Sequence, residues 1–344
     1  MRCARAILAL GGALLTLGPP SAARAYEHYA GPGGEPLRWA SFPVPYRLGP
    51  TERRCEERLR LLRRGFEAWM APPDSPVALR YEGPIDEAFV SGDGESSAVV
   101  LEAVGWPPEL GDARTTAGAT LHLSAAGTSQ LLEADLGLNA VEFNWADETP
   151  AADALDLWSV VTHEVGHLLG LEHACDGPGP IRCADAPASI REAALFPAAS
   201  PGDTSRRRPA ADDLAGLRAL YGPGTGAPPH ATVIVEGCAL TLRVEPAPGE
   251  PEPEVLLSES ETGEAIGPSG LDPLTTSPGR SWDVTLRGAN GKERTHFAAL
   301  TLPESCLPEE ETGCATSNQG APPTLALALV LALGLSLKTP GARA

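Results

Sequence analysis

Residues 163–173 constrain this chain more than any other segment, because they place three histidines and the carboxylate of Glu164 close together in sequence. His163 and His167 are four positions apart, which on an α-helix separates two side chains by about 40° around the axis and about 6 Å along it. Both imidazoles can therefore face the same ion. Glu164 lies beside that face, where its carboxylate can reach a metal-bound water and act as a general base.

Gly170 and His173 extend the pattern beyond the helix. Glycine enters the left-handed backbone conformation without a steric penalty from a Cβ atom, so the helix can end at Gly170 and the chain can turn back sharply. His173 can then approach the metal from another direction. Three neutral imidazoles leave a zinc ion with an open fourth position for water, which is typical of a catalytic site rather than a structural one. We predict His163, His167 and His173 as zinc ligands and Glu164 as the catalytic base.

The alternative interpretation is an ordinary amphipathic helix with exposed histidines. Its core-facing stripe would consist of Leu157, Val161, Val165 and Leu168, which recur at helical spacing. That interpretation does not explain Gly166, which costs a helix about 1 kcal/mol relative to alanine. It also does not explain why a third histidine, His173, follows shortly after Gly170. Close packing beside a metal accounts for both.

The run His-Glu-Val-Gly-His-Leu-Leu-Gly-Leu-Glu-His resembles the signature of the metzincin zinc peptidases, and most closely that of their matrixin branch. The resemblance spans roughly residues 39–221 and is densest at 133–173 and 193–221. It implies a zinc cofactor, a protein or peptide substrate and, on family resemblance alone, structural calcium (Ca2+). It also implies an α+β peptidase domain with a mixed, twisted sheet and a long active-site helix.

Two further segments carry the resemblance. Matrixins place a methionine turn beneath the zinc, and residues 193–197 match that turn with Leu195 in the methionine's position, which keeps an apolar floor of similar volume. Residues 133–139 resemble the matrixin strand that borders the substrate cleft. An extended substrate can add to such a strand by main-chain hydrogen bonds.

The N-terminal segment predicts export. Residues 1–25 combine two early arginines, an apolar run and an Ala-Arg-Ala end, which are the three parts of a secretory signal peptide with cleavage before Tyr26. A buried N-terminal helix is the alternative, and the glycine pair and Pro-Pro inside the segment disfavour it. The formal net charge of −19 becomes −22 once residues 1–25 are removed, since they hold three arginines and no acid. This balance argues against nucleic acid and anionic membrane surfaces as partners.

The body of the chain predicts a mixture of strands and helices. Residues 39–48 alternate loosely around two prolines and are interpreted as an edge strand. A helix is expected at 51–70, where six arginines surround an apolar stripe; a solvated helix face is favoured over a nucleic-acid patch. Further strands are expected at 77–81, 98–103, 120–124 and 133–145, and a short helix at 212–221. Asp153 or Asp156 can cap the active-site helix.

The cysteines predict disulfides in an exported chain. Cys175 and Cys183 flank a Gly/Pro-rich loop just past His173, where a local disulfide is favoured over a second metal site. Residues 222–229 have the composition of a linker. Beyond it, four alternating segments at 231–244, 254–258, 281–287 and 295–302 predict a small all-β domain that Cys238 and Cys306 could staple.

The C-terminal tail resembles a myxobacterial surface-sorting tag. Gly313-Cys314, a polar spacer, the apolar run at 324–337 and the basic Lys338 and Arg343 form three successive parts. Because the apolar run is shorter than the roughly 20 residues a membrane span needs, a processed tail is favoured over a permanent transmembrane helix. Attachment to the cell envelope is therefore expected only through this tail.

The sequence thus predicts five parts: a signal peptide (1–25), a matrixin-like zinc peptidase domain (26–222), a linker (223–230), a small β-domain (231–308) and a sorting tail (309–344). The predicted function is a secreted or surface-attached zinc metalloendopeptidase. The alternative is a catalytically inactive surface binding or adhesion protein on a metzincin-like scaffold. The joint presence of Glu164 and the three histidines favours the enzyme.

Overall fold

A computed structural model describes residues 26–49, 55–85, 89, 91–101, 105–177, 179–236, 239–245, 251–260, 265–266 and 281–301. The predicted signal peptide, the Cys238–Cys306 pair and the sorting tail lie outside these residues. Within the described ranges, no helix combines the length and the apolar character that a membrane crossing requires.

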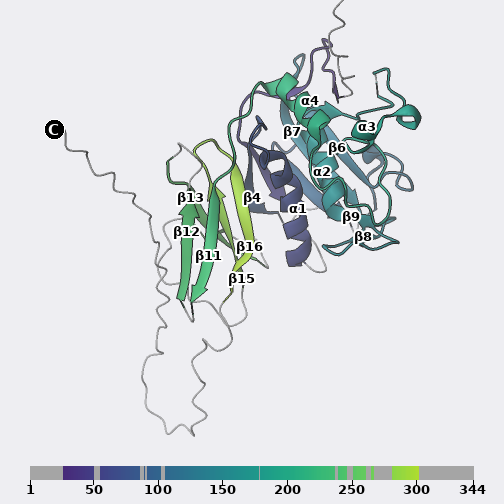
Figure 1. Ribbon diagram of the computed structural model, residues 1–344. Coiled ribbons are helices and arrows are strands. Elements are labelled where there is room, and N and C mark those ends of the chain that lie inside the picture. The colour runs from purple at the N-terminus through teal and green to yellow at the C-terminus, as the bar shows by residue number, and fades with distance from the viewer. Residues whose placement is uncertain are drawn as a thin grey trace, which may run out of the picture.

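The main sheet is mixed and has six strands (Figure 1). Its order is β2 (Arg38–Trp39), β7 (Gln130–Asn139), β5 (Ser97–Leu101), β3 (Val44–Leu48) and β4 (Leu79–Pro84), all in parallel pairs, and β6 (Gly118–Ser124) pairs antiparallel with β7. The mixed sheet expected from the sequence is present. Within the described residues β7 pairs on both sides, with β6 on one and with β2 and β5 on the other, whereas β6 pairs on one side only. The edge expected at residues 133–139 is therefore wrong, and β6 provides it instead.

The prediction of one edge strand at 39–48 is also wrong. The segment divides into β2 and β3, and β3 lies inside the sheet between β4 and β5. Pro45 is tolerated there because β5 pairs only with the end of β3, at Arg47 and Leu48, whereas Pro45 faces β4 alone. The missing N–H of Pro45 therefore removes no bond to β5.

Two helices, α1 (Cys55–Met70) and α2 (Leu157–Leu168), pack against each other and carry much of the core (Figure 1). They approach closely at Gly65, where an added Cβ atom would lie 2.3 Å from Cγ1 of Val161. Tyr46 of β3 stacks on Phe66 of α1 with ring centroids 3.7 Å apart. The helices α3 (Ala188–Arg191) and α4 (Ala211–Tyr221) follow later in the chain.

Short elements flank α2 at both ends. β1 (Glu27–His28) pairs antiparallel with β10 (Leu171–Glu172), and β8 (Trp145–Ala146) pairs with β9 (Leu155–Asp156). Two 3-10 turns, η1 (Pro108–Leu110) and η2 (Cys183–Asp185), lie in loops. The predicted disulfide between Cys175 and Cys183 is present, with Cα atoms 5.0 Å apart. It closes the loop just beyond His173.

The C-terminal part of the described chain consists of strands. β11 (His230–Glu236) and β12 (Ala239–Glu245) form a hairpin, so the single alternating segment expected at 231–244 is two strands. A second, four-stranded antiparallel sheet has the order β14 (Ala265–Ile266), β13 (Glu254–Glu259), β15 (Ser281–Arg287) and β16 (Glu293–Thr301). Figure 1 shows β16 beside α1 and β4.

Candidate metal centre and active site

The active-site helix α2 begins at a strong cap. The carboxylate of Asp156 accepts hydrogen bonds from the backbone N–H of Ser159 at 2.9 Å and from its hydroxyl at 2.6 Å. Arg207 donates to the same carboxylate, with Nη2 2.6 Å from Oδ1. Of the two capping candidates in the sequence, Asp156 is therefore the cap. The bonds satisfy an otherwise unpaired N–H at the helix start.

The turn after α2 depends on Gly170. Its φ angle is +91°, in the region that disfavours side chains. A Cβ atom at this position would also lie 2.4 Å from the carbonyl oxygen of Leu37, so the space admits only glycine. The chain reverses here into β10, as the sequence predicts, and delivers His173 to the histidines of α2.

His163, His167 and His173 form one cluster. Their candidate ligand atoms all lie within 4.8 Å of one another. The Nε2 atoms of His163 and His167 are 3.1 Å apart. Two nitrogens on a tetrahedral zinc ion, each bonded at 2.0–2.1 Å, would be about 3.3 Å apart. The helical pair thus has the spacing of two zinc ligands, and the ring of His173 lies 4.8 Å from that of His167 between centroids.

The two helical histidines are oriented by backbone carbonyls. His163 Nδ1 donates to the carbonyl of Ala194 at 2.7 Å, and His167 Nδ1 donates to that of Leu171 at 2.8 Å. These bonds fix the tautomer and leave each Nε2 free for a metal. Burial, with a smaller effect of His173, lowers the pKa of His163 to about 3, and burial also places the pKa of His167 well below its usual value. Neutral imidazoles are what a zinc ion binds, so these residues fit zinc.

Glu164 lies beside the histidines and is 4% exposed. Its Oε2 accepts a hydrogen bond of 2.9 Å from the hydroxyl of Thr120, on the edge strand β6. Burial raises the pKa of Glu164 to about 8, against a smaller opposing effect of Thr120. Gly118 makes room for the carboxylate, because a Cβ atom there would lie 2.7 Å from Oε1. This carboxylate is held at a defined position and can take or release a proton.

A turn that contains Leu195 lies beneath the cluster. Leu195 is 2% exposed and packs against Gly166, where an added Cβ atom would lie 2.4 Å from Cδ2 of Leu195 and 2.7 Å from Cζ2 of Trp69. The close packing that the sequence suggested for Gly166 is therefore present. Asp213 of α4 holds this turn, because its carboxylate accepts the N–H groups of Ala194 at 2.8 Å and Leu195 at 3.2 Å.

Sequence reasoning missed three residues of this site. Asp213 lies in the short helix expected at 212–221, and the sequence assigns it no role at the site. Tyr29 and His122 were not singled out, yet the hydroxyl of Tyr29 lies 3.4 Å from Nδ1 of His167, and His122 Nε2 donates to the carbonyl of His167 at 2.8 Å. The rings of Tyr29 and His122 are 4.7 Å apart between centroids. Their separation along the chain gives no local signal that could have identified them.

A cleft of about 860 Å³ opens over the cluster. Its floor contains the three histidines and Glu164, and its walls include the start of β6 and the segment after Leu195. The walls are lined by Gly118, Thr120, Glu142, Phe196, Pro197 and Arg206, among others. A cleft with a neutral three-imidazole centre and one buried carboxylate can hold a metal, a water molecule and an extended ligand together.

Comparison with known proteins agrees with this geometry. Residues 109–222 match the family model described as Matrixin. The chain is 30% identical over 187 residues to Metalloendoproteinase 4-MMP of Arabidopsis thaliana, an alignment that covers 52% of this chain and 42% of that protein. It is 28% identical over 209 residues to Metalloendoproteinase 1-MMP of the same plant, covering 57% and 47%.

A shorter alignment has a higher sequence identity. Metalloendoproteinase 5-MMP of Arabidopsis thaliana is 40% identical over 73 residues, or 21% of this chain and 16% of that protein. The chain thus spans less than half the length of these curated relatives. Matrixins use zinc, and the matched region contains all three clustered histidines and Glu164. The similarity and the site together support a matrixin-like metzincin metallopeptidase.

Proposed function

We propose that this protein is a zinc metalloendopeptidase that hydrolyses peptide bonds in an extended substrate. The observation that carries the proposal is the convergence of three neutral imidazoles beside a buried carboxylate, in a cleft large enough for a peptide. His163, His167 and His173 would hold the zinc. When bound, zinc would supply Lewis-acid chemistry, which polarises a carbonyl and lowers the pKa of a water molecule.

The proton transfers belong to Glu164. Its Oε atoms lie at the cleft floor, so the carboxylate can accept a proton from the attacking water and then donate it to the leaving amine. The Thr120 hydroxyl holds Oε2 and so restricts the side chain to one orientation. Burial raises the pKa of Glu164, which makes its carboxylate, once ionised, a stronger proton acceptor.

β6 provides the surface that would position a substrate. It pairs with β7 on one side, and in the described part of the chain its other edge has no strand partner. Because the start of β6 also lines the cleft, a peptide that adds to this edge would pass over Glu164 and the histidines. Cleavage inside a chain, rather than at an end, is expected because a substrate held by main-chain hydrogen bonds to β6 needs no free terminus.

Export and envelope attachment are part of the proposal and rest on the sequence of the two termini. Cleavage before Tyr26 would release the peptidase part, and processing at Cys314 would attach it to the cell surface. The calcium requirement stays an expectation from family resemblance. Mass spectrometry of the mature protein from its native host would locate both termini, and a mature chain that begins at Met1 would contradict the export signal.

The decisive test uses Glu164→Gln in the full chain with a mixed peptide library. The variant should retain about one zinc per chain and lose cleavage by about 100-fold or more, because only the proton carrier is removed. Glu109→Gln makes the same chemical change at an exposed carboxylate outside the cleft and should cleave like the wild type. Absence of cleavage by zinc-loaded wild-type protein would instead favour the inactive binding protein.

A further inference from the structure

The helix α1 presents charged groups to the C-terminal sheet, although the sequence suggested a solvated face. Arg63 is 3% exposed. Its Nη2 donates to the hydroxyls of Thr285 on β15 at 2.8 Å and Thr295 on β16 at 2.7 Å, and its Nη1 lies 3.5 Å from a carboxylate oxygen of Asp283. The prediction of a solvated face is therefore wrong for Arg63, because a sheet from the far end of the chain covers it.

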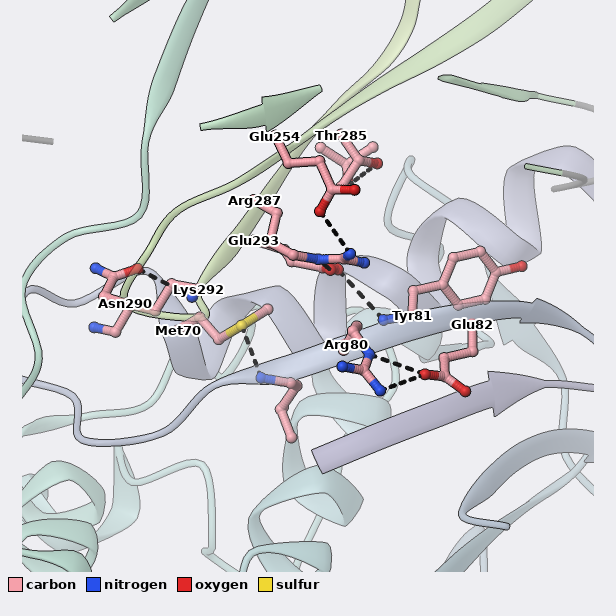
Figure 2. Close-up of polar contacts among 12 residues, drawn as sticks. Met70, Arg80, Tyr81, Glu82, Glu254, Thr285, Arg287, Asn290, Lys292 and Glu293 are labelled. Atoms are coloured by element: carbon pink, nitrogen blue, oxygen red, sulfur yellow. Dashed lines mark hydrogen bonds and ion pairs between the residues drawn. The ribbon is translucent and has the colours of Figure 1, made fainter. Parts of the chain in front are cut away.

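The sheet also places charged and polar groups against α1 and β4. Glu293 is 2% exposed, pairs with Arg287 at 2.7 Å, and accepts the backbone N–H of Tyr81 on β4 at 3.3 Å (Figure 2). The N–H of Thr295 donates to Glu67 of α1 at 3.2 Å. Hydrogen-bond donors of α1 and β4 thus meet acceptors of the sheet, and a donor of the sheet meets an acceptor of α1. Such a match is typical of a permanent contact, since each buried charge would be left without its partner if the surfaces slid apart.

The segment at residues 222–229, between the matrixin-like part and the C-terminal sheet, is also held by hydrogen bonds. Lys292 is fully buried, and its ammonium donates to the carbonyl of Pro72 at 3.1 Å and to that of Gly226. Asn290 donates to the carbonyl of Ala227 at 3.1 Å, and Thr225 N donates to Ser75 O at 3.2 Å. Residues 222–229, which have the composition of a flexible linker, therefore make bonds to both parts along their middle.

The contact continues from α1 to the active-site helix. Trp69, two residues beyond Glu67, donates its indole N–H to the carbonyl of Thr162 in α2 at 2.8 Å. Its ring packs against Gly166, which lies between the two helical histidines in sequence. Gly65 lets the helices approach at Val161. A shift of α1 would thus be transmitted directly to the residues next to His163 and His167.

We propose that the sheet β13–β15–β16 is a fixed intramolecular partner of α1 and β4 that supports the active-site helix from behind. The sheet therefore acts as a part of the peptidase structure and not as an independent module on a flexible tether. Arg63 is a positioning residue in this arrangement, since it acts through α1 and does not face the cleft. Removal of its contacts should loosen α2 as well as the sheet.

The test is hydrogen exchange measured by mass spectrometry on the full chain, with Arg63→Met as the main variant. Methionine keeps an unbranched apolar stem and removes the charge and donors. Peptides from β15–β16 and from residues 157–169 should both exchange at least about tenfold faster than in the wild type, because a buried ion pair has been broken. Thr295→Val, on the sheet side, should accelerate the same two regions to a smaller extent and serves if Arg63→Met fails to fold.

Arg80→Met is the matched control, because Arg80 lies on β4 and pairs with Glu82 at the exposed surface (Figure 2). It should leave both regions unchanged. Faster exchange in β15–β16 with unchanged exchange at 157–169 would overturn the proposal, as would no change in either region. Exchange is recorded in the presence of a chelator, so this result does not depend on whether the site holds zinc. The inference about the sheet can therefore fail while the proposed peptidase activity stands, and the reverse is also possible.

Discussion

The carboxylate of Asp213 accepts the backbone N–H of Ala194 at 2.8 Å, and the carbonyl of Ala194 in turn accepts Nδ1 of His163 at 2.7 Å. One peptide segment thus connects a buried acid on α4 to a metal-site histidine on α2. The same carboxylate accepts the N–H groups of Leu195 and Ala210. Asp213 therefore fixes the turn beneath the site as well as the start of its own helix.

Asp213→Ala should destabilise the protein by about 2 kcal/mol or more, because two buried N–H groups and one partly buried N–H group lose their acceptor. It should also weaken zinc retention, since the carbonyl that orients His163 is no longer held. Thermal melts and zinc analysis after dialysis measure both effects. Asp153→Asn removes an acid that is exposed at the cleft and should change neither quantity. Equal melting temperatures for Asp213→Ala and wild type would contradict this account of the turn.

His167→Ala should reduce bound zinc from about one ion per chain to nearly none. Two imidazoles remain, and they cannot complete the ligand set of a tight site. His296→Asn changes a histidine on β16, remote from the cluster, and should retain the full zinc content. Elemental analysis of the purified proteins gives the answer. The same zinc content in His167→Ala and wild type would exclude His167 as a ligand.

Gly166→Ala should destabilise the protein by roughly 1–3 kcal/mol, although alanine is the better helix former. The added methyl group would contact Leu195 and the ring of Trp69, neither of which has room to move in the core. Gly33→Ala, at a position with no atom within 4 Å, is the control. Chemical denaturation measures both. A Gly166→Ala protein as stable as the wild type would show that the turn with Leu195 does not press against α2.

The stability of the α1–sheet contact should fall as pH rises. Burial, opposed mainly by Arg63, raises the pKa of Glu67 from its ordinary 4.5 to about 7. The folded protein therefore holds a proton that the unfolded chain releases, and this stabilising effect is complete below about pH 4.5 and lost as pH rises through 7. The wild-type melting temperature should decrease between pH 5 and 8 by more than that of Glu67→Gln. Parallel curves for the two proteins would assign the dependence to other groups.

The sequence predicts those features that depend on neighbouring residues. Asp156 lies three positions from the N–H it caps, His163 and His167 are one helical turn apart, and Gly170 reverses the chain within a few residues. The disulfide between Cys175 and Cys183 closes a separation of eight positions. Backbone geometry and short-range bonding determine each of these, so the local pattern is sufficient.

The remaining features depend on contacts between distant segments. Tyr29 reaches His167 across 138 positions, and Arg63 reaches Thr285 across 222. A tyrosine just after an N-terminal strand, or an arginine on a polar helix face, has no local property that identifies its partner. The position of β3 inside the sheet depends on a distant segment as well. Its prolines indicate an edge strand, but they are equally compatible with an inner strand whose second partner, β5, pairs only beyond the last proline.

The pairing of β1 with β10 has a consequence for how the protein folds. β1 lies directly before Tyr29, and His28 donates to the carbonyl of Gly216 in α4 at 3.1 Å. The first strand of the described chain is thus joined to segments about 140 and 190 residues later. A growing chain would have no complete site until α4 had been synthesised and the first strand had found its place. Assembly of the histidine cluster should therefore be among the last events of folding, so the proposed activity would appear only once the rest of the domain is already formed.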